Sequence, residues 1–304
     1  MSASQAEWIR HRERGSAWLL RLMTWLSLHA GRRASRPLLH GIALYFFLFA
    51  PAARRASLDY LRRVLGRPPR PQDRYRQILC FATTIHDRVY LLNDRYDQFD
   101  IEVEGESLLR DAVASGRGVF LMGAHLGSFE VVRSLGRSHT IAPLVMAMYE
   151  DNARRINATL AAINPAAAPE IVPLGRMESM IRIGERLDAG AFVGVLADRT
   201  LGEEAVHPVG FLGAPAGFPL GPMRAAAILR RQVIFMAGLY LGGNRYQLVF
   251  EPVADFSDVE RVDRNARVVA AVERYASLLE KYCRRAPYDW FNFFDFWQAG
   301  NAVA

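Results

Sequence analysis

The segment GVFLMGAHLGSFE, residues 118–130, decides the fold of the middle of the chain. Residues 119–122 form a short apolar run that is typical of a buried strand, and the two glycines that follow allow the backbone to turn sharply. Ser128 is a residue type that caps helices, so the pattern predicts a helix over about residues 129–135. His125 is therefore expected at the carboxyl end of a strand, where open α/β sheets bind their ligands.

His125 and Glu130 are the first candidates for chemistry. A neutral imidazole in this place can take a proton from an attacking hydroxyl, and a carboxylate on its other ring nitrogen fixes the tautomer and stabilises the imidazolium. Glu130, in the first turn of the expected helix, is the candidate for that carboxylate. The chemistry requires no Ser or Cys nucleophile. The alternative is structural, with a loop histidine hydrogen-bonded to a glutamate that caps the helix.

Strands and helices alternate through the rest of the chain, which predicts an α/β fold with a mixed central sheet flanked by helices. Strands are expected over residues 99–103, 118–123, 143–148, 171–174, 191–197, 233–241 and 245–251. Helices are expected over residues 56–65, 72–92, 106–115, 129–136, 151–163, 177–189, 222–231 and 260–284. No internal repeat or low-complexity linker interrupts this pattern, so we expect residues 56–304 to form one α/β domain.

Residues 1–55 differ in character and are expected to form apolar helices that associate with a membrane. Residues 18–29 are apolar on much of a helical circumference, and residues 37–53 carry His40 as their only strongly polar side chain. The second stretch is at the short end of what spans a bilayer core. Arginines flank it on both sides, which argues against a simple span because positive charge normally marks one side. A helix in the membrane plane and an ordinary helix packed on the α/β domain are the alternatives.

The composition fits an enzyme that works at a membrane surface. The chain has 304 residues, 51% of them hydrophobic, and a net charge of +7, and Lys281 is the only lysine among its 38 basic residues. Guanidinium groups bind phosphate and carboxylate bidentately, which suits anionic lipid head groups or an acidic carrier protein; a solvated basic surface is the alternative. No zinc pattern, RNP-like segment or Arg-dense recognition helix indicates nucleic acid. No metal-ligand cluster or dinucleotide fingerprint predicts a cofactor.

The block GAHLGSFE, residues 123–130, closely resembles the His-x4-Asp/Glu block of the bacterial lipid A late acyltransferases, which belong to the glycerolipid acyltransferase superfamily. The resemblance continues in VLADR (195–199), GFLGAPA (210–216) and FPLGPMR (218–224). These four blocks follow one another in the order of the family, within a resemblance that covers roughly residues 60–297. The sequence looks like a member of this family.

The resemblance implies an enzyme in which a histidine deprotonates an acceptor hydroxyl, which then attacks the thioester of an acyl carrier protein or of coenzyme A. It assigns the general base to His125 and the charge-relay role to Glu130. The acceptor would be a membrane lipid or glycolipid, and the enzyme would work on the cytoplasmic face of a bacterial inner membrane. A non-catalytic lipid-binding relative is the alternative, and the presence of both His125 and Glu130 argues against it. A serine hydrolase is disfavoured because no Gly-x-Ser-x-Gly elbow is present.

Two arginine-containing segments are candidates for substrate binding. Arg154 and Arg155 follow an expected strand and begin a helix opened by Asp151. They look like the arginine that holds an anionic substrate group in related acyltransferases, and a solvated helical face is the alternative. Asp198 and Arg199 end an apolar strand, so the carboxylate needs a partner. The resemblance implies that both line the site, and a structural ion pair is the alternative.

The segment FPLGPMR, residues 218–224, resembles the block that binds the acceptor phosphate in glycerol-phosphate acyltransferases. Gly221 allows a ligand to approach the backbone, and free amides at the start of the following helix can receive phosphate. Arg224 is the candidate cation. Pro222 and Leu220 replace a threonine and a glutamate of that block, which removes contacts on which phosphate specificity depends. The alternative is a plain turn with Arg224 on the surface.

The segment PYDWFNFFDFW, residues 287–297, is densely aromatic. The lipid A enzymes have a Trp-rich, basic counterpart at this point, whereas this chain has Asp289 and Asp295 and no Arg or His. The chain therefore looks like a divergent branch of the family. One interpretation is a C-terminal segment that fills the core. The other is a set of rings that lines a groove for an acyl or aromatic chain.

Overall fold

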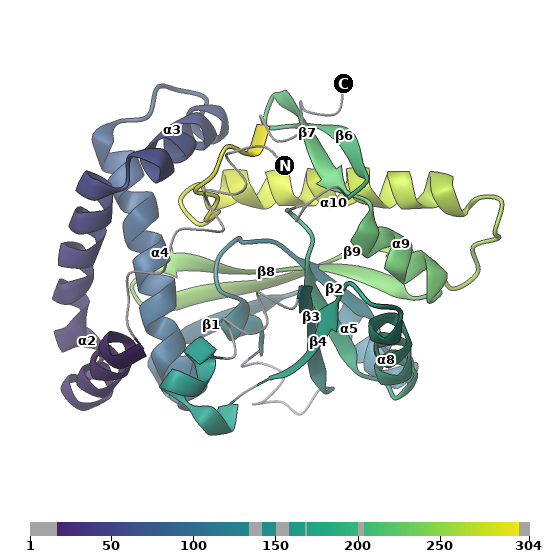
Figure 1. Ribbon diagram of the computed structural model, residues 1–304, viewed down its shortest axis with the longest axis horizontal. Coiled ribbons are helices and arrows are strands. Elements are labelled where there is room, and N and C mark those ends of the chain that lie inside the picture. Colours follow the sequence, from purple (N-terminus) through teal and green to yellow (C-terminus); the bar gives the residue numbers. More distant parts are fainter. Residues whose placement is uncertain (1–16, 134–141, 150–157, 168, 200–203, 298–304) are drawn as a thin grey trace.

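The computed structural model describes residues 17–133, 142–149, 158–167, 169–199 and 204–297, with a seven-stranded sheet at the centre (Figure 1). The strands lie in the order β1-β9-β8-β2-β5-β3-β4. They are β1 (Asp100–Glu104), β2 (Phe120–Gly123), β3 (Leu144–Tyr149), β4 (Glu170–Leu174), β5 (Phe192–Leu196), β8 (Gln232–Gly242) and β9 (Arg245–Asp255). β8 and β9 are antiparallel, and the other neighbours are parallel.

Helices cover both faces of this sheet (Figure 1). They are α2 (Ala17–Phe49), α3 (Pro51–Leu65), α4 (Pro71–Leu92), α5 (Glu106–Ala114), α8 (Met177–Asp188), α9 (Gly221–Ile228) and α10 (Arg264–Arg285). Short 3-10 helices cover Tyr96–Gln98 and Pro165–Ala167. Side chains of α3, α8, α9 and α10 belong to the hydrophobic cluster on one face, and those of α4 and α5 to the cluster on the other. The expected fold class, a mixed sheet flanked by helices, is confirmed.

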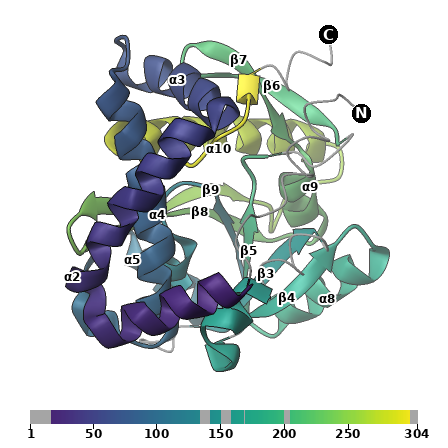
Figure 2. The same ribbon diagram turned by 60° about the vertical axis from the view of Figure 1, so that its left-hand side comes forward.

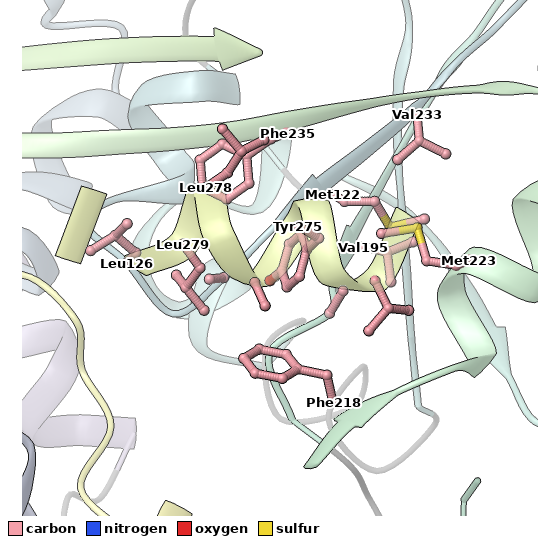
Figure 3. Packing of buried hydrophobic residues seen from close by; sticks show 14 of the residues in the cluster. Met122, Leu126, Val195, Phe218, Met223, Val233, Phe235, Tyr275, Leu278 and Leu279 are labelled. Carbon is pink, nitrogen blue, oxygen red and sulfur yellow. The ribbon is translucent and has the colours of Figure 1, made fainter. Parts of the chain in front are cut away.

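Strand β2 lies in the centre of the sheet, between β5 and β8, and is parallel to both. All of its residues are buried, as a strand covered on both faces must be. Figure 3 shows Met122 of β2, Val195 of β5 and Phe235 of β8 packed together with Tyr275 and Leu278 of α10. Each such side chain contributes about 1.5–3 kcal/mol by leaving water. The loop that follows β2 therefore starts from a rigid base.

The seven strands expected from the sequence are confirmed, with β9 running on to Asp255. The helix expected from residue 129 is present over residues 129–133. The end of that helix lies outside the described residues, as does the first half of the helix expected over residues 151–163.

A hairpin that the sequence pattern does not predict stands beside α10 (Figure 1). Strands β6 (Val206–Phe211) and β7 (Ala214–Pro219) pair antiparallel around a two-residue turn at Leu212 and Gly213, both with positive φ. Prolines in both strands hide the strand pattern, because proline cannot donate to a ladder. Both strands of a two-stranded ribbon are edge strands, so prolines are tolerated where the missing N–H would face away from the partner strand. The Leu212 amide donates to Glu280 of α10 at 2.6 Å, which anchors the turn.

Helix α2 is attached to the domain by a buried ion pair. It bends at Gly31, where the backbone leaves the helical region, and then runs along α4 (Figure 2). Arg32 donates two hydrogen bonds to Asp87 of α4, at 2.7 and 2.8 Å, and the Tyr246 hydroxyl of β9 donates to the same carboxylate at 2.8 Å. Burial raises the pKa of Asp87, but the bonds from its neighbours, Arg32 among them, outweigh it and hold that pKa below its ordinary value.

The opposite side of α2 exposes large apolar side chains, namely Trp25, Leu26, Leu38, Leu44, Tyr45, Phe46, Leu48 and Phe49. Within the described residues, no single helix has the length and apolar character needed to cross a membrane. The stretch from Met23 to Phe49 has the length and apolar character of a membrane span only when α3 is counted with it. The axes of these two helices meet at an angle of 95°. The domain boundary expected at residue 55 falls inside α3, which continues through it (Figure 2).

We predict that Asp87→Asn destabilises the protein by about 3–5 kcal/mol, because it leaves the Arg32 charge buried without its carboxylate. The free energy of urea unfolding measures this loss, with the exposed Asp97→Asn as the control. Since the folded-state pKa of Asp87 is lowered, its contribution is present above about pH 4 and is lost as the pH falls. The difference between the variant and the wild type should therefore shrink on acidification. Equal stabilities at neutral pH would contradict the prediction.

Candidate active site

His125 lies in the tight loop between β2 and the helix that begins at residue 129. The loop passes so close to β8 that a Cβ on Gly127 would lie 2.0 Å from the carbonyl oxygen of Gly238. Gly127 also has φ +70°, a conformation that side chains rarely adopt. The Ser128 amide donates to the Gly238 carbonyl at 2.7 Å. These constraints explain the glycine and fix the path of the backbone through His125.

Asp198, at the end of β5, supplies the carboxylate that contacts His125. In the β2/β5 register Gly123 pairs with Leu196, so His125 and Asp198 each lie two residues beyond a paired position. The Nδ1 atom of His125 lies 2.9 Å from Oδ1 of Asp198, and the His125 amide donates to Oδ2 at 3.0 Å. The Asp198 side chain is fully buried, whereas 34% of the His125 side chain is exposed. The structure thus places an imidazole and a carboxylate together at the carboxyl ends of two central strands.

The electrostatics of this pair favour a neutral imidazole beside an ionised carboxylate. Burial raises the pKa of Asp198, but three effects outweigh it and hold that pKa well below its ordinary value: the charge of His125 when its ring is protonated, the hydrogen bonds that His125 donates, and the charge of Arg199. Burial and the Arg199 charge lower the pKa of His125 below its ordinary value, although Asp198 opposes them. With an ionised acceptor at Nδ1, the neutral ring carries its proton there. Nε2 is then left with a lone pair that can accept a proton.

Glu130 does not occupy the place at His125 that the sequence analysis expected for it. Its buried carboxylate pairs with Arg133 at 3.2 Å and with Arg88 of α4 at 3.7 Å. The helix that carries Glu130 directs it toward these arginines, while the neighbouring strand delivers Asp198. The carboxylate on His125 is therefore Asp198, and this corrects the expected geometry. The VLADR segment had already marked Asp198 as site-lining, but only the adjacency of β2 and β5 reveals its partner.

Arg199 joins the site to the C-terminal segment. Its Nη2 donates to the Phe291 carbonyl at 2.8 Å, and its guanidinium lies 4.9 Å from the ring centre of Phe294. Burial lowers the pKa of Arg199, and the Asp198 charge opposes this. Arg154 and Arg155, the other expected anion-binding arginines, lie outside the described residues.

Gly221 and Arg224 lie in the first turn of α9, with Arg224 exposed. The Oε2 atom of Glu204 is 3.9 Å from the position of a Cβ on Gly221. Burial raises the pKa of Glu204. A carboxylate therefore already stands beside this helix start, and it would repel a phosphate when ionised. Within the described residues, no three His, Cys, Asp or Glu side chains form a group that could hold a metal ion.

The C-terminal aromatic segment closes over the loop that carries His125. The Phe291 amide donates to the His125 carbonyl at 2.8 Å, and the Gly127 amide donates to the Asp289 carbonyl at 2.9 Å. Trp290 lies between them, fully buried in the main core cluster with Phe296 and Trp297. Of the two interpretations of this segment, the structure supports the one in which its rings fill the core.

One known protein family matches almost the whole chain. The sequence pattern of the bacterial lipid A biosynthesis acyltransferases matches residues 3–299. The chain belongs to this family. Membership confirms the resemblance seen in the sequence and makes the protein an acyltransferase of lipid metabolism. A search of curated proteins found no match. Members of the family are membrane-associated and transfer acyl groups from a donor to a lipid acceptor.

We predict that Asp198→Asn and Glu130→Gln separate catalysis from stability. If His125 is the base, the rate rises with pH through the His125 pKa, which Asp198 raises. Asp198→Asn should move this rise to lower pH and reduce the plateau rate by roughly 10²- to 10⁴-fold. Glu130→Gln should mainly lower the thermal unfolding midpoint, because it removes a charge that neutralises the buried Arg133. A larger rate loss in folded Glu130→Gln than in Asp198→Asn would return the relay role to Glu130.

Proposed function

We propose that the protein moves a fatty acyl or related polyketide-type acyl group from a thioester to a hydroxyl of a membrane lipid or glycolipid, with His125 as the general base. The observation that carries this proposal is the His125–Asp198 pair, 2.9 Å apart at the carboxyl ends of β2 and β5 in a chain of the lipid A acyltransferase family. The expected donor is an acyl carrier protein or coenzyme A. No metal or redox cofactor takes part in the proposed steps.

In the proposed reaction, Nε2 of His125 first accepts a proton and later returns it. Nε2 of His125 takes the proton of the acceptor hydroxyl, and the hydroxyl oxygen attacks the thioester carbonyl carbon. The ionised Asp198 stabilises the imidazolium through Nδ1. The tetrahedral intermediate then collapses with cleavage of the C–S bond, and the thiolate takes the proton back from Nε2. The products are the ester and the free thiol, and the histidine is neutral again.

We further propose that charged groups around this pair bind the anionic parts of the substrates. Arg199 is the candidate within the described residues, because it lies beside Asp198 and next to the C-terminal segment. Arg154 and Arg155 remain candidates on sequence grounds alone. Gly221 and Arg224 remain candidates for the acceptor, with Glu204 as the obstacle to a phosphate. A non-catalytic lipid-binding protein is the alternative function, and it gives no reason for a neutral His125 paired to a buried carboxylate.

The apolar side of α2 is proposed to rest in the cytoplasmic face of the bacterial inner membrane. Phe46 is 51% exposed and Phe49 is 66% exposed, at the end of α2 where the chain turns into α3. Arg55, in the first half of α3, and Arg62, near its end, are both exposed. Apolar rings that enter the acyl region and arginines that contact anionic head groups are the two components of interfacial binding.

We predict that purified protein slowly hydrolyses an acyl thioester without an acceptor, because water can replace the hydroxyl. His125→Ala should remove this hydrolysis and the transfer reaction together, by about 10²- to 10⁴-fold, since one base serves both nucleophiles. Thiol release from acyl carrier protein and from acyl coenzyme A measures it, and circular dichroism shows whether the variant is folded. Tight lipid binding without transfer or His125-dependent thioester cleavage, over several carriers and chain lengths, would favour the lipid-binding alternative.

We predict that Phe46→Glu combined with Phe49→Glu releases the protein from vesicles of phosphatidylethanolamine and phosphatidylglycerol. Burying each ring contributes about 1.5–3 kcal/mol, so the partition coefficient should fall at least roughly tenfold. Met177→Glu with Ile181→Glu is the matched control, because these residues are 76% and 58% exposed on α8, away from α2. Salt at 1 M should weaken wild-type binding, since it screens charges beyond about 3 Å. Undiminished co-sedimentation of the double variant would contradict the interfacial role of α2.

A further inference from the structure

The indole of Trp290 contacts the carboxylate that holds His125. Its Nε1–H donates to Oδ2 of Asp198 at 3.1 Å, and the same oxygen accepts the backbone N–H of His125 at 3.0 Å. Oδ1 is then directed at Nδ1 of His125, at 2.9 Å. Oδ2 thus accepts two hydrogen bonds and Oδ1 accepts one, and these three bonds together fix the plane of the Asp198 carboxylate. Without the indole N–H, Oδ2 would keep one of its two hydrogen bonds, the one from the backbone N–H of His125.

Trp290 is itself held in place by hydrogen bonds on its backbone. Leu126 and Trp290 form an antiparallel bridge, so the catalytic loop and the C-terminal segment share a short ladder. The side-chain amide of Gln77 in α4 donates to the Trp290 carbonyl at 2.7 Å, and the Ser57 hydroxyl of α3 donates to Gln77 at 2.5 Å. Both polar side chains are fully buried. A chain of buried hydrogen bonds thus leads from α3 to His125.

The packing of the ring adds a second constraint. Tyr60, Phe211 and Phe296 meet the indole edge to face, with ring centres 4.9, 5.4 and 5.0 Å away. Any large aromatic side chain at position 290 could fill this part of the core. The N–H is different, because its acceptor is an ionised carboxylate in a buried site, where a hydrogen bond is strong and directional.

We propose that Trp290 is a positioning residue, whose indole N–H fixes the Asp198 carboxylate in the rotation that presents Oδ1 to Nδ1 of His125. This inference rests on the proposed role of His125 as the base. Trp290 does not touch the reacting atoms and acts through Asp198. The aromatic C-terminal segment is then part of the catalytic apparatus as well as of the core.

The experiment replaces Trp290 with 3-benzothienylalanine, which keeps the shape of the ring and lacks the N–H. The same replacement at Trp297 is the matched control, because that buried indole donates to the Phe211 carbonyl at 3.3 Å and not to Asp198. Imidazole NMR of histidine-labelled protein, with the His125 signal assigned by His125→Gln, gives the His125 pKa without any substrate. Thioester cleavage gives kcat and KM in parallel.

The charges around His125 define the pH range of the titration. Asp198 raises the His125 pKa, and Arg199 lowers it. Burial keeps Tyr275 and Cys283 uncharged by raising the pKa of each well above its ordinary value. Burial also raises the pKa of Asp289 to about 8. His125 is therefore the group of this cluster expected to titrate below its ordinary pKa, above the range of Asp198 and below that of Asp289.

We expect the analogue at position 290 to lower the His125 pKa, because a carboxylate that is free to rotate presents Oδ1 less well to Nδ1 and so stabilises the imidazolium less. The kcat should fall by roughly tenfold or more at an unchanged KM, which is the usual effect of losing a hydrogen bond to a charged group. The analogue at position 297 should change neither quantity. An unchanged His125 pKa in the 290 variant, or an equal shift in the 297 control, would overturn the inference. Absence of both acyl transfer and thioester cleavage in the wild type would refute the proposed function, while the titration would still test the Trp290 contact.

Discussion

The buried carboxylate of Asp198 is the constraint on which the rest of the site depends. Moving an ionised carboxylate out of water costs several kcal/mol unless donors replace the solvent. Here the donors come from two separate segments, the His125 loop and the C-terminal segment, and Asp198 itself sits at the end of β5. A change in any one of them leaves a buried charge short of a partner. The same charge fixes the tautomer of His125, so the hydrogen bonds that folding requires are also those that the proposed role of His125 as a base requires.

The sheet makes this arrangement possible because β2 and β5 are parallel neighbours. Parallel strands end at the same edge, and the register brings residues that are far apart in sequence to equivalent positions beyond that edge. Core packing on both faces of β2 keeps the edge rigid, as Figure 3 shows for Met122 and its neighbours. Rigid support matters because a base must stay within hydrogen-bonding distance of its substrate. The proposed chemistry of the His125 loop therefore depends on the core side chains that pack against β2.

Much of the fold was predictable from sequence because its signals are local. The apolar run before His125 and the glycines around it indicated a buried strand and a tight turn, and both are present. The β6–β7 hairpin was missed because its prolines contradict the usual strand pattern. The prediction that Glu130 is the carboxylate bonded to His125 was wrong for a different reason. Glu130 is close in sequence, whereas Asp198 is close in space, and only the strand order distinguishes them. The proposed role of Trp290 is not predictable from its segment, because the aromatic composition indicates a filled core or an acyl groove and says nothing of a hydrogen bond to Asp198.

The exposed apolar side of α2 and its buried Arg32 restrict which substitutions or replacements of this helix the protein can tolerate. Here the helix with the exposed rings also carries Arg32, the counter-charge of Asp87 inside the domain. Truncation before α3 would leave that carboxylate facing Tyr246 with its cation removed. If α2 is the membrane-binding helix proposed above, any exchange of it must preserve one arginine at the bend, so the membrane-binding surface and the interior of the domain constrain each other.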